Sequence, residues 1–153
     1  MTLDEFLLAA KDKESFEVGE QIDPDAVNQI ESTLGIVLAP TYRSFVIQAG
    51  WVSWFGHEIF GVSFDKSQDT VSRTSSMRHL LEQFSLAMPA KGNIVAEIFG
   101  GGFCFLHSLT SNRAGQISAH APDEGYKEVQ YWKSLEDFFE YSIFGYHNWI
   151  GVG

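Results

Sequence analysis

Apolar positions spaced three and four residues apart predict helices near the start of the chain. The first begins with a capping box of Thr2 and Glu5, and its apolar stripe consists of Leu3, Phe6, Leu7 and Ala10. The second begins at Asp23-Pro24, with the aspartate as N-cap and the proline in the first turn, and it ends at Gly35. Between the two, the acidic stretch 14–25 has no such periodicity.

A third helix is predicted from Pro40 to a C-cap at Gly50, which we expect to be left-handed. Tyr42 and Phe45 share one face of this helix. Because side chains three apart in a helix lie side by side, we expect both rings to be buried against the rest of the fold.

After Gly50 the pattern changes to aromatic and β-branched residues and predicts a hairpin. Its strands would span about 51–55 and 58–64, with Gly56 at the first position of the turn. The hairpin carries Trp51, Trp54, Phe55 and Phe60, and a second aromatic group near the end of the chain consists of Trp132, Tyr146 and Trp149. Most of these rings must be core, whereas any exposed ring would suit a partner interface.

The second half of the chain predicts a helix, four strands and a last helix. The helix would bury a stripe and stop before Pro89; the stripe consists of Met77, Leu80, Leu81 and Phe84. The strands are short and separated by turn residues, at 94–99, 103–109, 116–121 and 128–132. Ser134 and Asp137 cap the last helix, whose apolar residues are Leu135, Phe138, Phe139 and Ile143.

The order of these elements indicates the fold class. Helices and antiparallel hairpins come in separate runs, which is typical of α+β proteins rather than of alternating βαβ units. Hydrophobic residues make up 44% of the 153 residues, enough for a folded chain. We expect residues 1–153 to form a single α+β domain, with helices packed against a twisted antiparallel or mixed β-sheet.

The net charge is −10, from 20 acidic and 10 basic residues. It disfavours nucleic acid and anionic membranes as partners and favours a basic protein. Residues 1–31 carry −7 and residues 114–153 carry −4, whereas the middle carries +1. If the two ends pack together, they form one anionic face; otherwise the charge serves only solubility.

Charge and aromatic content together select candidate partner-binding residues. They are Glu17, Glu20, Trp51, Trp54, Asp123, Glu124 and Glu128. Trp51 or Trp54, whichever is exposed, would anchor the partner, and the acidic residues would steer its approach. The sequence leaves homo-oligomerisation open.

No pattern for catalysis, a cofactor or a metal is evident. Cys104 and His107 lie three apart on a predicted strand and so face opposite sides, which prevents a nucleophile and base pair. The histidines at 57, 79, 107, 120 and 147 include no pair four apart on a predicted helix, so a metal site would need a cluster formed only in space. We therefore expect a protein that is not an enzyme. We also expect it to be cytoplasmic, since neither a signal peptide nor a membrane-length apolar run is present.

The run from Asp23 to Val46 resembles the opening of the SUKH superfamily, whose pattern is E-x-x-L-G-x-x-L-P-x-x-Y-x-x-F-L. The residues that keep its spacing are Glu31, Leu34, Gly35, Leu38, Tyr42 and Phe45, followed by Gly50 and Phe60-Gly61. Later landmarks extend the resemblance over most of the chain. Two positions differ, since Ala39 replaces the usual proline and Trp51 stands where a second glycine is common.

The resemblance implies a function in binding. The best-known bacterial role that it implies is immunity, in which a small cytoplasmic protein blocks a toxin domain, often a nuclease, encoded by a neighbouring gene. A nuclease presents cations to phosphates, so an acidic inhibitor would occupy that surface as a nucleic acid mimic. Fungal relatives are regulatory hubs of cell-wall assembly, so the alternative is a non-catalytic interaction module. A third alternative is an enzyme whose site is assembled from residues scattered along the sequence.

Overall fold

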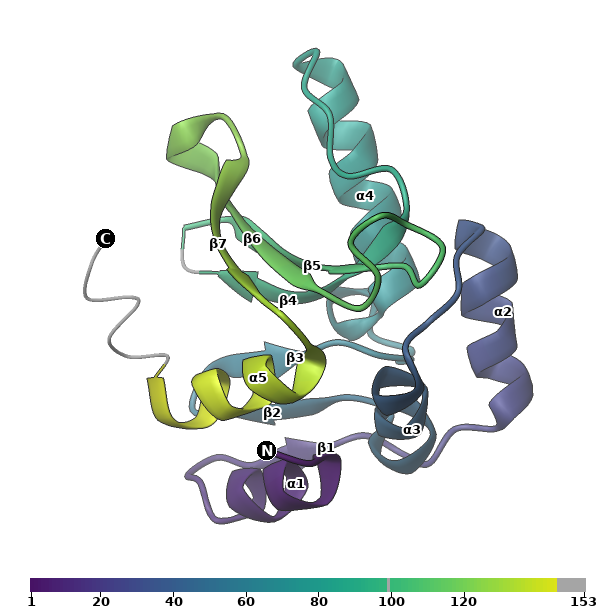
Figure 1. Cartoon of the computed structure of the whole chain (residues 1–153). Coiled ribbons are helices and arrows are strands. Elements are labelled where there is room, and N and C mark those ends of the chain that lie inside the picture. Colours follow the sequence, from purple (N-terminus) through teal and green to yellow (C-terminus); the bar gives the residue numbers. More distant parts are fainter. Residues whose placement is uncertain (99, 146–153) are drawn as a thin grey trace.

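Helices and two antiparallel sheets make up the structure (Figure 1). The computed structural model describes residues 1–98 and 100–145. The helices are α1 (Leu3–Lys11), α2 (Pro24–Leu34), α3 (Pro40–Ala49), α4 (Thr70–Gln83) and α5 (Leu135–Glu140), followed by a π-helical turn at Tyr141–Gly145. The strands are β1 (Glu17–Val18), β2 (Val52–Trp54), β3 (His57–Ile59), β4 (Gly92–Ile98), β5 (Gly102–His107), β6 (Ile117–Ala121) and β7 (Lys127–Trp132). This arrangement confirms the α+β class.

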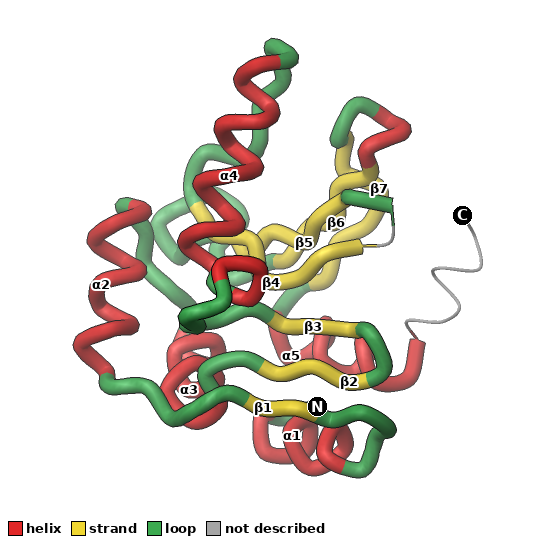
Figure 2. Tube along the Cα trace, turned by 180° about the vertical axis from the view of Figure 1, so that it is seen from behind, coloured by secondary structure: helices red, strands yellow, loops and turns green. Residues whose placement is uncertain are grey.

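The two sheets lie next to each other, with β3 adjacent to β4. The order is β1-β2-β3 in the first and β4-β5-β6-β7 in the second, and every pairing is antiparallel. They meet where the Phe60 N–H donates to the Val95 carbonyl oxygen at 2.8 Å, just after β3. Helices α1, α3 and α5 lie on one side of β1–β3, and none of the described helices covers the other side, which faces the viewer in Figure 2. That uncovered side is called the open face below.

The predicted caps of the first helices are confirmed. The hydroxyl of Thr2 accepts the Glu5 N–H, and Gly35 ends α2 with φ +67° and ψ +41°. Gly50 has the expected positive φ of +73°, but its ψ of −67° lies outside the left-handed helical region. A Cβ at Gly50 would stand 2.6 Å from the Glu20 carbonyl oxygen, so the close passage of the β1–α2 loop also requires glycine there.

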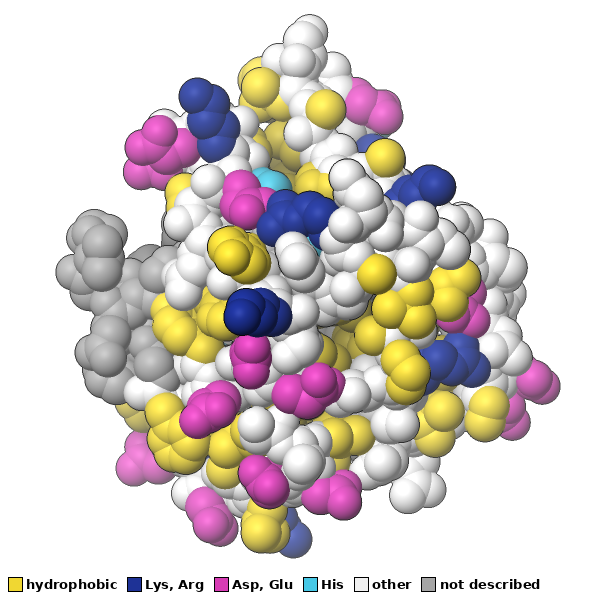
Figure 3. All heavy atoms as spheres, viewed as in Figure 1, with side chains coloured by type: hydrophobic (Ala, Val, Ile, Leu, Met, Phe, Trp, Pro, Cys, Tyr) yellow, Lys and Arg dark blue, Asp and Glu magenta, His cyan; other side chains and the backbone are white. Residues whose placement is uncertain are grey.

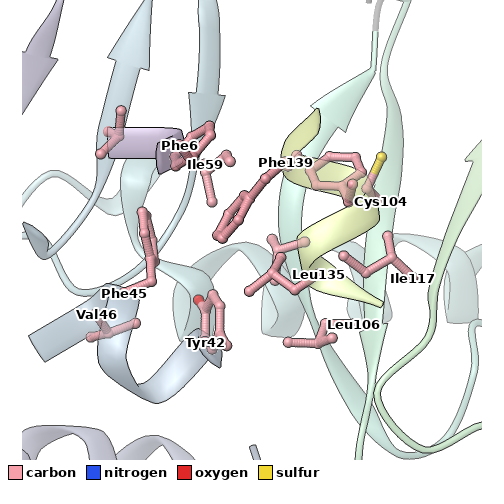
Figure 4. Packing of buried hydrophobic residues seen from close by; sticks show 14 of the residues in the cluster. Phe6, Tyr42, Phe45, Val46, Ile59, Cys104, Leu106, Ile117, Leu135 and Phe139 are labelled. Carbon is pink, nitrogen blue, oxygen red and sulfur yellow. The ribbon is translucent and has the colours of Figure 1, made fainter. Parts of the chain in front are cut away.

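The main core joins the first and last helices. The ring of Phe6 in α1 stacks on Phe139 in α5 with the centroids 4.2 Å apart, and Phe139 points between elements of both sheets (Figure 4). Tyr42 and Phe45 are both 0% exposed, which confirms the prediction for α3. The Tyr42 hydroxyl donates to the Phe60 carbonyl oxygen at 2.7 Å, so a core tyrosine also fixes the junction of the two sheets.

The β2–β3 hairpin is shorter than predicted, and its turn lies one residue earlier. Trp54 pairs with His57, so the turn residues are Phe55 and Gly56, with φ of +48° and +83°. Positive φ at both positions is the geometry of a type I′ turn, which suits the twist of the strands. Gly56 therefore takes the second turn position instead of the first. Strand β3 ends at Ile59 because the backbone of Phe60 already pairs with β4.

The predicted buried stripe of α4 is wrong in two positions. Leu80 is 39% and Phe84 67% exposed, and the buried residues of α4 are Thr70, Thr74 and Leu81. The inner side of α4 meets the backbone of β4, which requires hydrogen-bonding partners. The Thr70 hydroxyl donates to the Ile94 carbonyl oxygen at 2.6 Å, and the Ile94 N–H donates to the Thr74 hydroxyl at 2.8 Å. The last turns of α4 extend beyond the sheet (Figure 1).

Candidate partner-binding surface

The open face of β1–β3 carries a row of polar side chains. Across the strands, Val18 pairs with Val52 and Val52 with Ile59, and Val52 and Ile59 are buried toward the helices. Side chains alternate between the two faces of a strand. The neighbouring row of Glu17, Ser53 and Glu58 therefore points to the open face.

This row ends at a hollow of about 240 Å³ between the two sheets. Its lining consists of Gly56, Glu58, Phe60, Glu97, Ile98, Gly100 and Gly101. Gly100 and Gly101 have φ of +88° and +95°, and a Cβ at either position would meet nothing within 4 Å. Two carboxylates thus face a hollow, and the described residues of the β4–β5 turn that line it are glycines.

The charges around the hollow are unbalanced. Burial raises the pKa of the Glu58 carboxyl above its usual value; nearby Arg73 opposes this rise, while Glu97, Asp65 and Glu17 add to it. Arg73 forms an ion pair with Glu97 at 3.0 Å, and its guanidinium carbon lies 4.9 Å from the centroid of the Phe60 ring. One arginine therefore stands among four carboxylates, and the face is anionic.

Two aromatic side chains close in sequence to β2 and β3 are accessible. The indole of Trp51 covers Gly19, where a Cβ would come within 2.6 Å of two indole atoms, and the tryptophan remains partly exposed. Phe64, in the loop after β3, is fully exposed. Exposed aromatic rings beside charges are typical of protein interfaces.

Of the seven predicted site residues, the structure brings Glu17 and Trp51 to the open face. Glu20 is exposed and follows Gly19 in the loop beside Gly50. Trp54 is 2% exposed and packs edge-on against Phe6 in the core with the centroids 5.6 Å apart. Trp51 is consequently the accessible member of the tryptophan pair.

The other three predicted residues lie elsewhere. Asp123 and Glu124 are in the turn between β6 and β7, far from β1 in Figure 1, and Glu128 on β7 is held by Arg113 in an ion pair. The five acidic candidates therefore do not form one face. The ends do meet through α1 and α5, and Figure 3 shows acidic side chains gathered over these helices.

A buried polar chain on the four-stranded sheet was not predicted. His107 Nε2 and His120 Nε2 each lie 2.8 Å from the Ser118 hydroxyl, and His120 Nδ1 lies 2.9 Å from the Tyr126 carbonyl oxygen. A carbonyl only accepts, so His120 Nδ1–H donates to Tyr126 and His120 Nε2 accepts from Ser118. His107 Nε2–H in turn donates to Ser118. The β5–β6 register creates this chain, and the alternation of Ser118 and His120 was its only sequence signal.

Burial determines the chemistry of this chain. Burial and the positive Arg113 lower the pKa of His107 to about 4, and burial also lowers the pKa of His120. Ser118 is 0% exposed, so its hydroxyl is out of reach of a substrate in this conformation. Cys104 faces the opposite, helix-covered side, as predicted, and burial raises the pKa of its thiol.

The described residues also show whether potential metal ligands come together in space. Among residues 1–98 and 100–145, no group of three or more His, Cys, Asp or Glu side chains is placed to hold a metal ion. Tyr146, His147 and Trp149 lie outside the described residues, as does the predicted end of a strand at position 99.

Comparison with known families decides the assignment. The family model SUKH_6, described as SMI1-KNR4 cell-wall, matches residues 24–139. The chain belongs to the SUKH superfamily. A search of curated proteins found no match.

The matched part of this SUKH protein runs from α2 into α5. It contains Trp51 and Glu58 of the open face and Glu97 of the hollow, whereas α1 and β1, with Glu17, precede it. None of the helices described here is long and apolar enough to cross a membrane. Membership of the family indicates an immunity protein or an interaction module of the Smi1/Knr4 type.

Proposed function

We propose that this SUKH protein is an immunity protein, which binds and neutralises a cognate toxin encoded by a neighbouring gene. The observation that carries the proposal is the open face, an uncovered sheet surface with Glu17, Glu58 and Trp51 in a family that includes immunity proteins. The protein would act by binding alone, as a stoichiometric inhibitor.

The charge of the chain favours a basic toxin domain, such as a nuclease. A nuclease must present cationic side chains to phosphates, and a net charge of −10 would attract such a surface over several ångströms. Electrostatic attraction speeds encounter, while a partly exposed tryptophan slows dissociation. The acidic face would thus occupy the nucleic acid site of the toxin.

Co-expression tests this function. The toxin domain encoded next to the gene should arrest growth alone, and the SUKH protein should restore growth and co-purify with the toxin domain. A variant with Trp51→Ala and Glu58→Gln should fold but protect less, whereas Phe84→Ala, at the far end of α4, should protect fully. Failure of the folded wild type to protect or co-purify would contradict the proposal.

The description of the matching family favours one rival, a cell-wall regulatory module. A gene without a toxin gene beside it, together with a cell-wall defect on its deletion, would support this rival. Growth rescue from the neighbouring toxin would support immunity instead.

A further inference from the structure

We propose that the hollow beside Glu58 receives an arginine side chain of the protein partner. The inference rests on the proposed binding function and specifies which contact the open face makes. It assigns a role to Glu58 and Glu97, which come from different sheets.

Glu58 is the first part of the argument. Its carboxylate is half-buried, and no ion pair within the described part of the chain neutralises it. Water is partly removed from this charge, and repulsion by Glu97, Asp65 and Glu17 acts against the attraction of Arg73, so that the pKa of Glu58 remains raised. An anion in this situation gains more from a cationic partner than a solvated surface carboxylate does.

Arg73 provides the second, independent observation. Its guanidinium already lies over the Phe60 ring and pairs with Glu97, at 4.9 Å and 3.0 Å respectively. Glu97 and Phe60 thus already hold one guanidinium, on the side where Arg73 lies. The same two residues, Phe60 and Glu97, also line the hollow from the side of Glu58.

The shape of the hollow favours arginine over other cations. Its volume of about 240 Å³ admits one long side chain, and Gly100 and Gly101 add no side chain to its described lining. A guanidinium is planar and donates two parallel hydrogen bonds to a carboxylate, whereas an ammonium is a compact and strongly hydrated charge. The size and the negative charge of the hollow therefore favour a guanidinium as its ligand.

The probe is a short peptide, acetyl-Gly-Arg-Gly-amide, titrated into the ¹⁵N-labelled protein and followed by NMR. We expect saturable shifts at the backbone amides of Gly56, Gly100 and Gly101. The lysine peptide should bind several-fold more weakly, and the citrulline peptide, which has the shape but no charge, should produce no saturable shift. Equal, non-saturating shifts for the arginine and lysine peptides would overturn the inference.

Three variants sharpen the test. Glu58→Gln should lower the affinity for the arginine peptide about tenfold, the loss expected for a hydrogen bond to a charged group. The matched control Glu124→Gln removes an exposed charge from the β6–β7 turn and should leave affinity unchanged. Arg73→Met removes the guanidinium that now competes for Phe60 and Glu97 and should strengthen binding several-fold. A melting curve for each variant verifies the fold.

These outcomes separate the inference from the proposed function. If Glu58→Gln and Glu124→Gln behave alike toward the peptide, the arginine site is wrong even when the protein still rescues growth from the toxin. If the peptide binds as expected and no toxin is neutralised, the arginine site stands and the immunity function is wrong.

Discussion

The two faces of the β2–β3 hairpin differ completely although they alternate residue by residue. On one face Val52 and Ile59 are buried under helices, whereas on the other Ser53 and Glu58 face outward with no helix above them. A two-layer fold needs only one side of a sheet to form its core. The covered face therefore supplies stability and leaves the open face available for recognition, so substitutions on the two faces should have separable effects.

The largest effect is expected on the covered side. Phe45→Ala should lower the free energy of unfolding by about 3 to 5 kcal/mol through lost burial and a cavity, a large part of the 5 to 15 kcal/mol typical of a domain. Phe64→Ala removes a fully exposed ring and should change the free energy of unfolding by less than about 0.5 kcal/mol. Urea denaturation compares the two, and equal losses would contradict the division between the faces.

On the open face, Trp51→Ala should weaken partner binding by about 2 kcal/mol, mainly through faster dissociation. Phe84→Ala is the matched control, because this ring is exposed at the end of α4 and away from the open face. Binding kinetics on immobilised toxin domain provide the measurement. A slower association with unchanged dissociation would show that Trp51 is no anchor.

Acid should destabilise the protein through the histidines of the four-stranded sheet. The pKa of His107 is about 4 in the folded state and lies near 6.5 in the unfolded chain. Between these values the unfolded state binds more protons, so the unfolding free energy falls as the pH drops from 6.5 toward 4. In urea denaturation over this pH range, the unfolding free energy of the His107→Gln variant should fall less steeply than that of the wild type. The control is His79→Gln, which replaces an exposed histidine of α4 and should leave the pH dependence as in the wild type.

Steering by charge should give a smaller effect. Replacing Glu17 and Glu58 by Gln should slow association with the toxin several-fold, and raising salt from about 50 to about 500 mM should do the same, because the Debye length shrinks from roughly 14 to 4 Å. The double substitution Asp123→Asn and Glu124→Gln removes as much charge from the far end of the molecule and should slow association less. An association rate indifferent to salt and to both pairs would exclude steering.

The smallest effect is expected for stability at Glu58. Its pKa is raised in the folded state, so the folded protein holds the proton more tightly and loses stability as the pH rises through the raised pKa. Glu58→Gln should therefore melt slightly higher than the wild type at pH 7, with the difference disappearing in acid. A lower melting temperature at pH 7 would mean that the carboxylate stabilises the fold.

The sequence predicted the elements whose signals are local. The caps at Thr2, Asp23 and Ser134 depend on residues two or three positions away, and each is present. Strand β1 was missed because Glu17 and Val18 are both exposed and pair only because β2 lies beside them. The buried side of α4 was predicted wrongly for a related reason. Its contact with β4 is made by threonine hydroxyls that bond the β4 backbone, whereas the apolar periodicity predicted that leucine and phenylalanine side chains would be buried.

The same distinction applies to the binding surface. Glu17 and Trp51 were found from charge and aromatic content. Glu58 and Glu97 were missed because they meet only where the two sheets join, and no spacing in the sequence encodes that junction. Acidic content alone also grouped Glu17 with Asp123 and Glu124, which the fold places at different ends.

The stacking of Phe6 on Phe139 has a consequence for folding kinetics. These rings come from the first and last α-helices of the described chain, so the packing of α1 is complete only after α5 has formed. Contacts between residues so far apart carry a large loop-closure cost and slow the search for the native state. We expect α1 to leave the ribosome before the other helices described here, yet to gain its full protection from hydrogen exchange only once α5 has been synthesised.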